Sequence, residues 1–520
     1  MNTDGVTAVT AAQGVATAAG TRHPAGGTGR TGQRPGSTGG IVLVAALLGF
    51  FMLSLDSTAV NVALPGIERD LGGSTAGLQW VIDAYTLVLA SLLMLAGSTA
   101  DRIGRKRIFR AGLVVFSLGS LLCGLAPSLG LLIAARVLQA VGGSMLNPVA
   151  MSIIRNVFED PRERAQAIGL WGAVFGVSLA LGPVAGGALV DSVGWRWVFF
   201  VNVPIGLIAF VLTTLYVPRS RAAHPRRLDP VGQVLVIAGL ATLTYAIIDA
   251  PRAGWTSAGT LALFAFSLLC LGALVWYELR RPEPLIEMRF FRSAPFSGAT
   301  TIAVCAFAAA GGFLFLNTLY LQGVRHLSPL HAGLYLLPMA GMVLVCAPVS
   351  GRLVARRGAR PPLILAGAAV TVASVMLTQL TATTSTAYLL AAYLVFGIGW
   401  GLVNPPVTNT AVSEIPASQA GVASAIASTS RQVGMTLGVA VIGAIAGGTL
   451  SGALGPSFAA ATHAGWWICV GLGLVCLVLG WLTTTARAEE TARETAERFQ
   501  ETEPAAGPPT RYGPRELAPS

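Results

Sequence analysis

Charged residues are scarce in this chain, and lysine is almost absent. Only 11% of the 520 residues are charged, whereas soluble domains carry about a quarter. The one lysine, Lys106, lies between two arginines. A phosphate-binding loop requires Gly-Lys-Ser/Thr, so the chain is not expected to be a self-contained ATP-driven pump.

Cysteine and histidine are also few, and their positions exclude further chemistry. The six cysteines fall inside apolar runs, and none has a CxxC or Cys/His spacing that would ligate a metal. The five histidines lie in tails, loops or helix ends, and no HExxH or GxSxG sequence is present. We therefore expect no enzyme, no metal site and no cofactor, which leaves an ion gradient as the energy source.

Long apolar runs dominate what is present, since hydrophobic residues make up 53% of the chain. About 20 such residues cross a bilayer as a helix, and lipid offers no partner to an open backbone. The sequence therefore predicts an all-α membrane protein. Fourteen candidate spans occur, at residues 41–66, 79–100, 108–127, 130–155, 165–190, 195–217, 230–250, 258–278, 294–322, 329–350, 361–382, 386–412, 419–447 and 463–485.

The basic residues are segregated to one side of these spans. One set of alternate loops holds twenty Arg and Lys residues, and the opposite set holds only Arg69, Arg196, Arg252 and Arg325. Cytoplasmic loops carry this excess. We therefore expect a multi-pass protein of the cytoplasmic membrane with both termini in the cytoplasm, and we read the net charge of +11 as topology rather than nucleic-acid binding.

A weak internal repeat divides the chain. The segment from Gly97, GSTADRIGRK, and the segment from Gly351, GRLVARRGAR, share two glycines seven residues apart followed by basic residues. Parallel halves of this kind are typical of transporters. The predicted domains are a disordered cytoplasmic tail (1–40), an N-terminal six-helix bundle (41–217), two extra transmembrane helices with loops (218–293), a C-terminal six-helix bundle (294–485) and a cytoplasmic tail (486–520).

Ionisable residues inside the spans are the candidates for function, because each costs at least about 2.5 kcal/mol at the centre of a membrane helix. Asp56, Asp83 and Arg136 all map to the outer half of the N-terminal bundle. Either Arg136 only neutralises two buried acids, or at least one acid alternates between a proton and a cationic substrate. Three aromatic or amide side chains nearby could complete a pocket, namely Trp80, Tyr85 and Gln139. Trp80 also fits the membrane interface.

Small residues mark the fifth span. Gly182 and Gly186 are four residues apart, Gly187 follows, and Pro183 can bend the helix. This spacing allows two helices to pack closely and pivot, although generic helix packing also uses glycines.

Together these segments resemble the major facilitator superfamily, and specifically its fourteen-spanner drug/proton antiporter branch (EmrB/QacA-like). The loop after the second span matches the superfamily motif GxLaDrxGRK, LDSTAVNVALP with Asn61 resembles the first-span motif, RVLQAVGG from Arg136 the fourth-span motif, and GPVAGG from Gly182 the fifth-span antiporter motif. Ala140 and Ala355 depart from these patterns. The loop residues that match are Gly97, Asp101, Arg102, Gly104, Arg105 and Lys106.

The resemblance implies roles for these residues. Asp101 would meet the N-terminus of a helix in the other half and its basic neighbours would join a charge network, a latch that breaks in each transport cycle. Asp56 and Asp83 would be functional acids, and Arg136 would be linked to proton coupling. Asn61, Trp80, Tyr85 and Gln139 would line the same region, with Glu414 and Arg431 as secondary candidates.

We therefore expect a transporter that exports a hydrophobic, cationic drug or toxic metabolite in exchange for protons. Its partners would be that amphiphilic small molecule, protons and the lipid bilayer, with no nucleic acid, and it would be a monomer. A proton symporter or biosynthetic-metabolite exporter of the same fold is the alternative, and a non-transporting membrane receptor is another.

Overall fold

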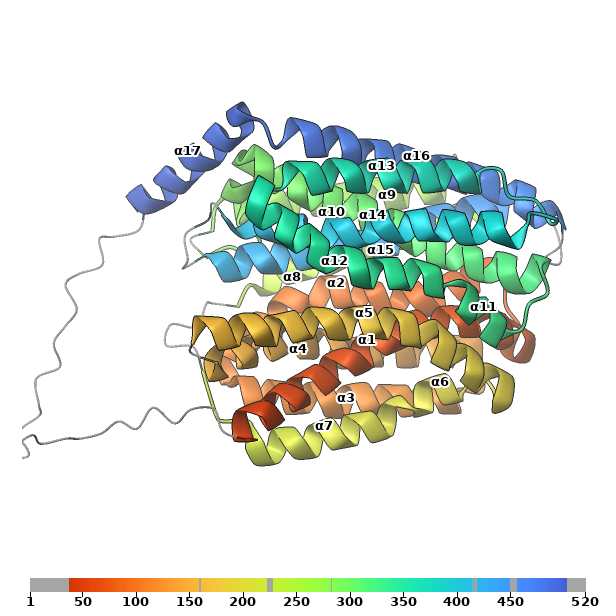
Figure 1. Cartoon of the computed structure of the whole chain (residues 1–520), viewed down its shortest axis with the longest axis horizontal. Coiled ribbons are helices and arrows are strands. Elements are labelled where there is room, and N and C mark those ends of the chain that lie inside the picture. The colour runs from red at the N-terminus through yellow and green to blue at the C-terminus, as the bar shows by residue number, and fades with distance from the viewer. Residues whose placement is uncertain are drawn as a thin grey trace, which may run out of the picture.

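The computed structural model describes residues 37–158, 160–221, 228–281, 283–413, 415, 419–448 and 456–502. In these ranges every regular element is helical, which confirms the predicted all-α fold. Figure 1 shows the helices lying side by side along the long axis, in a lower group formed by helices before residue 217 and an upper group formed by helices from residue 294 onward. The predicted disordered tail falls on residues 1–40, most of which lie outside the described ranges.

The first group contains the helices that precede residue 217. Serine caps begin two of these helices: the Ser74 hydroxyl accepts from the Gly77 amide and the Ser128 hydroxyl from the Leu131 amide. The predicted span 195–217 is divided into a single turn and a longer helix. The group is α1 (Ser37–Leu71), α2 (Thr75–Ile103), α3 (Arg105–Leu125), α4 (Leu129–Val157), α5 (Pro161–Ser192), α6 (Trp197–Phe200) and α7 (Asn202–Tyr216).

Two helices and a short turn connect the groups. Asp229 caps α8, which packs on its partner α9 and also on α2 and α15. This hairpin therefore contacts both groups. The elements are α8 (Pro230–Ala253), α9 (Ala258–Glu278) and the 3-10 turn η1 (Met288–Arg292).

The second group follows the same pattern of long helices. The predicted span 329–350 is split at Leu336 into a short helix and a long one. A charged helix, α17, then packs on α10 and on η1. The elements are α10 (Ala294–Leu319), η2 (Tyr320–Val324), α11 (Pro329–Tyr335), α12 (Leu337–Arg357), α13 (Arg360–Leu377), α14 (Thr386–Ser413), α15 (Ala420–Gly448), α16 (Pro456–Leu482) and α17 (Ala486–Thr502).

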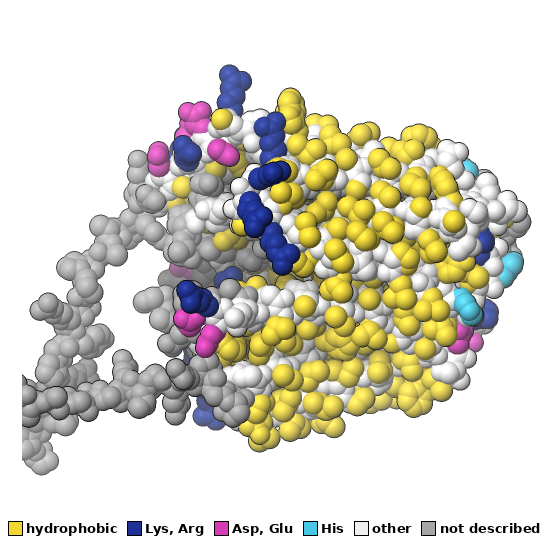
Figure 2. All heavy atoms as spheres, viewed as in Figure 1, with side chains coloured by type: hydrophobic (Ala, Val, Ile, Leu, Met, Phe, Trp, Pro, Cys, Tyr) yellow, Lys and Arg dark blue, Asp and Glu magenta, His cyan; other side chains and the backbone are white. Residues whose placement is uncertain are grey.

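Thirteen segments of the described chain are long and apolar enough to cross a membrane. The predicted span that is not among them, 419–447, corresponds to α15, a 29-residue helix that packs against α10 and α2. Figure 2 shows hydrophobic side chains covering the middle of the molecule, while dark blue and magenta side chains gather mainly toward the left end of the view. We call that end the basic face and the other the opposite face.

Candidate functional site

A buried ion pair joins α1 to α4. The Arg136 guanidinium donates from Nη1 to Asp56 Oδ2 at 2.6 Å, and the two side chains are 1% and 0% exposed. The structure thus brings together two of the residues predicted from sequence. Removing such a pair from water is expensive unless further hydrogen bonds complete it.

Two further polar side chains, Gln139 and Asn202, donate to Asp56. Gln139 Nε2 donates to Asp56 Oδ1 at 2.8 Å, and Asn202 Nδ2 donates to the same oxygen at 2.9 Å. Gln139 also donates to Ser120 Oγ at 2.6 Å and accepts from Arg136 at 2.6 Å. Asp56 therefore accepts three hydrogen bonds from three different side chains, and its negative charge is matched by one guanidinium.

The same guanidinium reaches the second helix. Arg136 Nε donates to the Val81 carbonyl at 3.0 Å, and the guanidinium carbon lies 4.0 Å from the centre of the Tyr85 ring. A cation over an aromatic face is attracted by the ring quadrupole. Arg136 thereby connects Asp56 on α1 to α2, where its contact residue, Val81, precedes Asp83 by two positions.

Asp83 has the opposite environment. Its residue exposure is 0%, yet neither carboxylate oxygen accepts a hydrogen bond from any described residue. The Thr86 hydroxyl approaches it but donates to the Ile82 carbonyl at 3.3 Å. An isolated buried carboxylate is costly unless it gains a proton or a cation.

Asp83 lies where the two groups of helices meet. One turn before it, Gln79 Nε2 donates to the carbonyls of Val439 and Ala440 on α15 at 2.9 and 3.0 Å. One turn after it, Thr86 accepts from the Thr436 hydroxyl at 2.8 Å. Because Gln79, Asp83 and Thr86 share one helical face, Asp83 is positioned between two polar contacts that cross from α2 to α15.

The other predicted residues have environments of their own. The Trp80 ring packs against Tyr245 of α8, with the centroids 6.1 Å apart. Asn61 is buried and donates to the Ser57 carbonyl of its own helix at 2.9 Å. The Tyr85 hydroxyl has no hydrogen-bond partner among the described residues.

The loop motif forms a compact turn on the basic face. Asp101 pairs with Arg105 at 3.1 Å, and the Arg105 amide donates to the Ser220 carbonyl at 3.1 Å. Gly104 has a φ of +119°, a conformation that favours glycine. Gly97 packs on Pro148, Arg102 is exposed, and Lys106 is partly exposed. The expected contact of Asp101 with a helix of the other half stays a prediction, because Glu414 and residues 416–418 before α15 lie outside the described residues.

The glycines of α5 lie at close helix contacts. A side chain at Gly182 would overlap Thr58, and one at Gly186 would meet Ala59, both on α1. A side chain at Gly187 would overlap the backbone of Pro329 and Leu330, and Gly333 packs in the same way on the Pro183 carbonyl. The motif therefore packs α5 on α1 and, near the opposite face, on α11 of the second group.

A carboxylate adds to this second contact. Asp191 Oδ2, at the end of α5, accepts from the Ser328 hydroxyl at 2.8 Å and from the Leu330 amide at 3.0 Å. The acid thus caps the beginning of α11 across the two groups. In the second group, Arg431 donates to Ser428 and Thr408 at 2.7 and 3.3 Å.

Sequence reasoning missed several of these partners. Asn202 and Ser120 are single polar residues within apolar spans, and Gln79 precedes the noted Trp80 by one position. Each is buried, so a search for amide and hydroxyl side chains inside spans would have found them. Their meeting with Asp56 or α15 depends on helix packing between distant segments.

The long apolar helices, arranged in two groups, are typical of a membrane transporter. The chain matches the Major Facilitator Superfamily over residues 46–439, and it belongs to that superfamily. This membership confirms the resemblance to the superfamily and the prediction of a transporter rather than an enzyme. The fourteen-spanner drug/proton antiporter branch stays a prediction.

Its relatives include proteins named for drug resistance. The chain is 38% identical over 416 residues to the Multidrug resistance protein Stp of Mycobacterium tuberculosis, covering 80% of this chain and 77% of that protein. It is 38% identical to the Tetracenomycin C resistance and export protein of Streptomyces glaucescens, covering 78% of this chain and 75% of that protein. It is 36% identical to the Puromycin resistance protein pur8 of Streptomyces alboniger, covering 86% and 91%.

Solved structures support the fold. A bacterial homolog of the human lysosomal transporter Spinster, in an inward-facing and unoccupied conformation, matches with a TM-score of 0.59 at 20% identity, over 89% of this chain and 98% of that one. A D-xylose-proton symporter matches with a TM-score of 0.63 at 13% identity, over 86% of this chain and 98% of that one.

Proposed function

We propose that this protein exports a hydrophobic, cationic drug or toxic metabolite across the cytoplasmic membrane in exchange for protons, with the basic face in the cytoplasm. The observation that carries the proposal is Asp83, a fully buried carboxylate without a hydrogen-bond partner among the described residues, at the contact between α2 and α15. The names of its relatives support a drug as the substrate class.

The chemistry follows from the cost of an unpaired buried charge. With no cation present, Asp83 is stabilised by taking up a proton, and a bound cation is expected to displace that proton. Proton and substrate would therefore occupy the acid in turn, which couples their movements in opposite directions. Asp56 is poorly suited to this exchange, because Arg136 already neutralises it.

Arg136 has a positioning role in this scheme. It binds Asp56 on α1 and the Val81 carbonyl on α2, so it fixes the helix that carries Asp83. The contact of Asp191 with the start of α11 supports a gate at the opposite face, and the Asp101 turn supports one at the basic face. Alternate closure of two gates around one acid is alternating access.

Everted membrane vesicles test the proposal. Antiport predicts that an acid interior drives uptake of a cationic dye into vesicles containing the protein. If that gradient instead abolishes uptake, the protein is a symporter, and binding without flux indicates a receptor. Export of a neutral antibiotic in preference to a cation would favour the biosynthetic-metabolite exporter, which the name of the tetracenomycin relative supports.

A further inference from the structure

Two carboxylates meet at the basic-face end of the α8–α9 hairpin, outside the network described above. Asp229 begins α8, where its Oδ1 accepts from the Gly232 amide at 3.0 Å, and Glu278 ends α9. Each residue is only 2% exposed. Acids at helix ends near a membrane surface are usually hydrated, so burial of both needs a cause.

The remaining oxygens of this pair lack a hydrogen bond of good geometry within the part of the chain that the structure describes. Asp229 Oδ2 and both Glu278 oxygens accept no hydrogen bond from the described residues. A side chain at Gly232 would overlap Glu278 Oε1 and Asp229 Oδ2 together, so the two oxygens face the same small space. Two acceptors facing each other without a hydrogen between them repel, and each loses its hydration.

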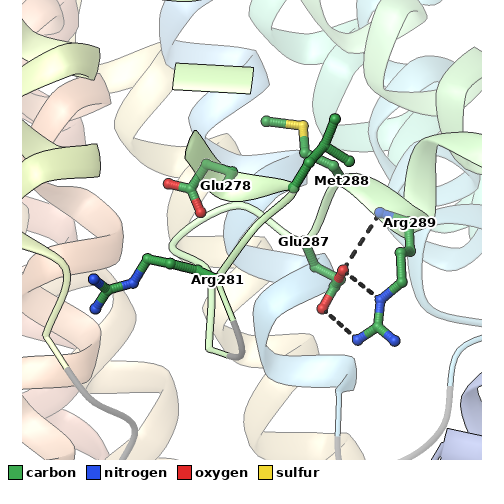
Figure 3. A pocket seen from close by; sticks show the side chains of 6 residues that line it. Glu278, Arg281, Glu287, Met288 and Arg289 are labelled. Atoms are coloured by element: carbon green, nitrogen blue, oxygen red, sulfur yellow. Dashed lines mark hydrogen bonds and ion pairs between the residues drawn. The ribbon is translucent and has the colours of Figure 1, made fainter. Parts of the chain in front are cut away.

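The surrounding charges neutralise only part of the pair. Arg281 Nε is 3.8 Å from Asp229 Oδ2, while its Nη1 donates to the Tyr277 hydroxyl at 2.6 Å. Across the pocket, Arg289 donates from Nε and Nη2 to the two oxygens of Glu287 at 2.8 and 2.9 Å. Figure 3 shows Glu287 and Arg289 bonded to each other and separate from Glu278. Among the described residues, Arg281 is therefore the cation paired with these two carboxylates.

A second feature favours one retained negative charge. The backbone N–H groups of Leu285 and Ile286 approach Glu278 without forming a hydrogen bond of good geometry. Together with Arg281 they stabilise a single anion. A second anion beside the first has no comparable partner, so the arrangement suits two carboxyl groups with one hydrogen between them.

We propose that Asp229 and Glu278 form a proton-binding site, in which one proton bridges Asp229 Oδ2 and Glu278 Oε1. The proton comes from water through a cavity of about 250 Å³ lined by Glu278, Arg281, Glu287, Met288 and Arg289. When the proton is released, Asp229 and Glu278 are both ionised and have the Arg281 guanidinium beside them. The site requires no metal and no substrate.

The proposed site lies at the beginning of a helix that contacts both groups, so binding of the proton would affect those contacts. One turn along α8 from Asp229, Gln233 Nε2 donates to the Ser91 carbonyl of α2 at 2.6 Å. The same helix packs on α15. Repulsion within the deprotonated pair would loosen the beginning of α8 and its contacts with both groups. Given the proposed orientation, the site reports cytoplasmic pH.

Infrared spectroscopy of the purified full-length protein tests this site without any transport assay. A buried protonated carboxyl group gives a carbonyl-stretch band that ionised carboxylates lack. We expect one such band near neutral pH to disappear in Glu278→Gln and in Asp229→Asn. Glu287→Gln is the matched control and should keep it, because Glu287 pairs with Arg289. Asp83 is expected to give a band of its own, so all the proteins are compared in an Asp83→Asn background. There, a band retained in both variants of the pair overturns the proposal.

A stability measurement covers the case in which a variant folds poorly. Glu278→Gln replaces the shared O–H by an amide N–H, which does not titrate. Its melting temperature should therefore fall less than that of the wild type between about pH 5 and pH 8, because an unfolded glutamic acid releases its proton at about pH 4.3 while the folded pair keeps it to about neutral pH. An equal fall in both proteins contradicts the proposal. Restoration of wild-type stability at high pH by Na⁺, K⁺ or Mg²⁺, without the infrared band, would assign a metal ion instead. Failure of proton-driven export would leave these results unaffected.

Discussion

Two aspartates, 27 positions apart in the sequence, have opposite environments in the fold. Asp56 accepts from Arg136, Gln139 and Asn202, whereas Asp83 accepts from no described residue. Both were equally plausible proton carriers from the sequence, because each is an acid in an apolar span. The difference lies in the neighbours supplied by other helices. It supports our proposal of an exchanging role for Asp83 and a positioning role for the Asp56 pair.

A double-mutant cycle tests the positioning role. Arg136→Met alone leaves Asp56 buried without its cation, and Asp56→Leu alone leaves Arg136 uncompensated. Each should lower the free energy of unfolding by about 3–5 kcal/mol. The double variant removes both charges and should be more stable than either single variant. Melting temperatures in detergent measure this, and additive losses would contradict a coupled pair.

The sequence predicts only some of the hydrogen-bond partners around Asp56. The i, i+3 spacing of Arg136 and Gln139 correctly placed them on one helical face, and they are bonded at 2.6 Å. Asn202 and Ser120 could not be assigned, because nothing local to the spans 195–217 and 108–127 indicates that they face Asp56. Such contacts depend on the rotation of each helix in the bundle, which a single sequence does not specify.

At the scale of the helices, α5 connects the two groups through backbone contact. Gly187 meets the backbone of Pro329 and Leu330, and Gly333 meets that of Pro183. The sequence indicated a close-packing helix from the spacing of Gly182 and Gly186. It could not indicate the partner, because α11 arises from a break at Leu336 within a continuous apolar run.

Substitution of one glycine should therefore alter the balance of conformations. Gly187→Ala places a methyl group against the backbone of α11 and should favour opening at the opposite face. Spin labels at Ser192 and Thr383 report the distance between the groups there, which should increase. The matched control is Gly172→Ala on the same helix, where a side chain meets nothing within 4 Å. Equal distances in all three proteins would rule out this contact as a gate.

At the scale of the whole molecule, apolar and charged surfaces are separated along the helix axes. Hydrophobic side chains cover the middle, and most arginines lie at one end (Figure 2). The predicted limits of most spans agree with the helices to within a few residues, since twenty apolar positions leave little freedom. The orientation rests on the excess of Arg at that end and remains a prediction.

Single cysteines test the orientation. All six native cysteines are buried, so exposed substitutions can be labelled selectively. Arg356→Cys on the basic face should react with a membrane-impermeant maleimide only in everted vesicles. His331→Cys on the opposite face should react in intact cells. The reverse pattern would place the termini outside the cytoplasm.

The most direct test of the central claim is the export of a permanently cationic dye by Asp83→Asn in proteoliposomes with an imposed proton gradient. The account predicts that proton-driven export falls at least about tenfold, equivalent to about 1.4 kcal/mol, with a smaller loss for a neutral substrate. Export of the dye at the wild-type rate would contradict the claim that this carboxylate is occupied in turn by a proton and by the cation.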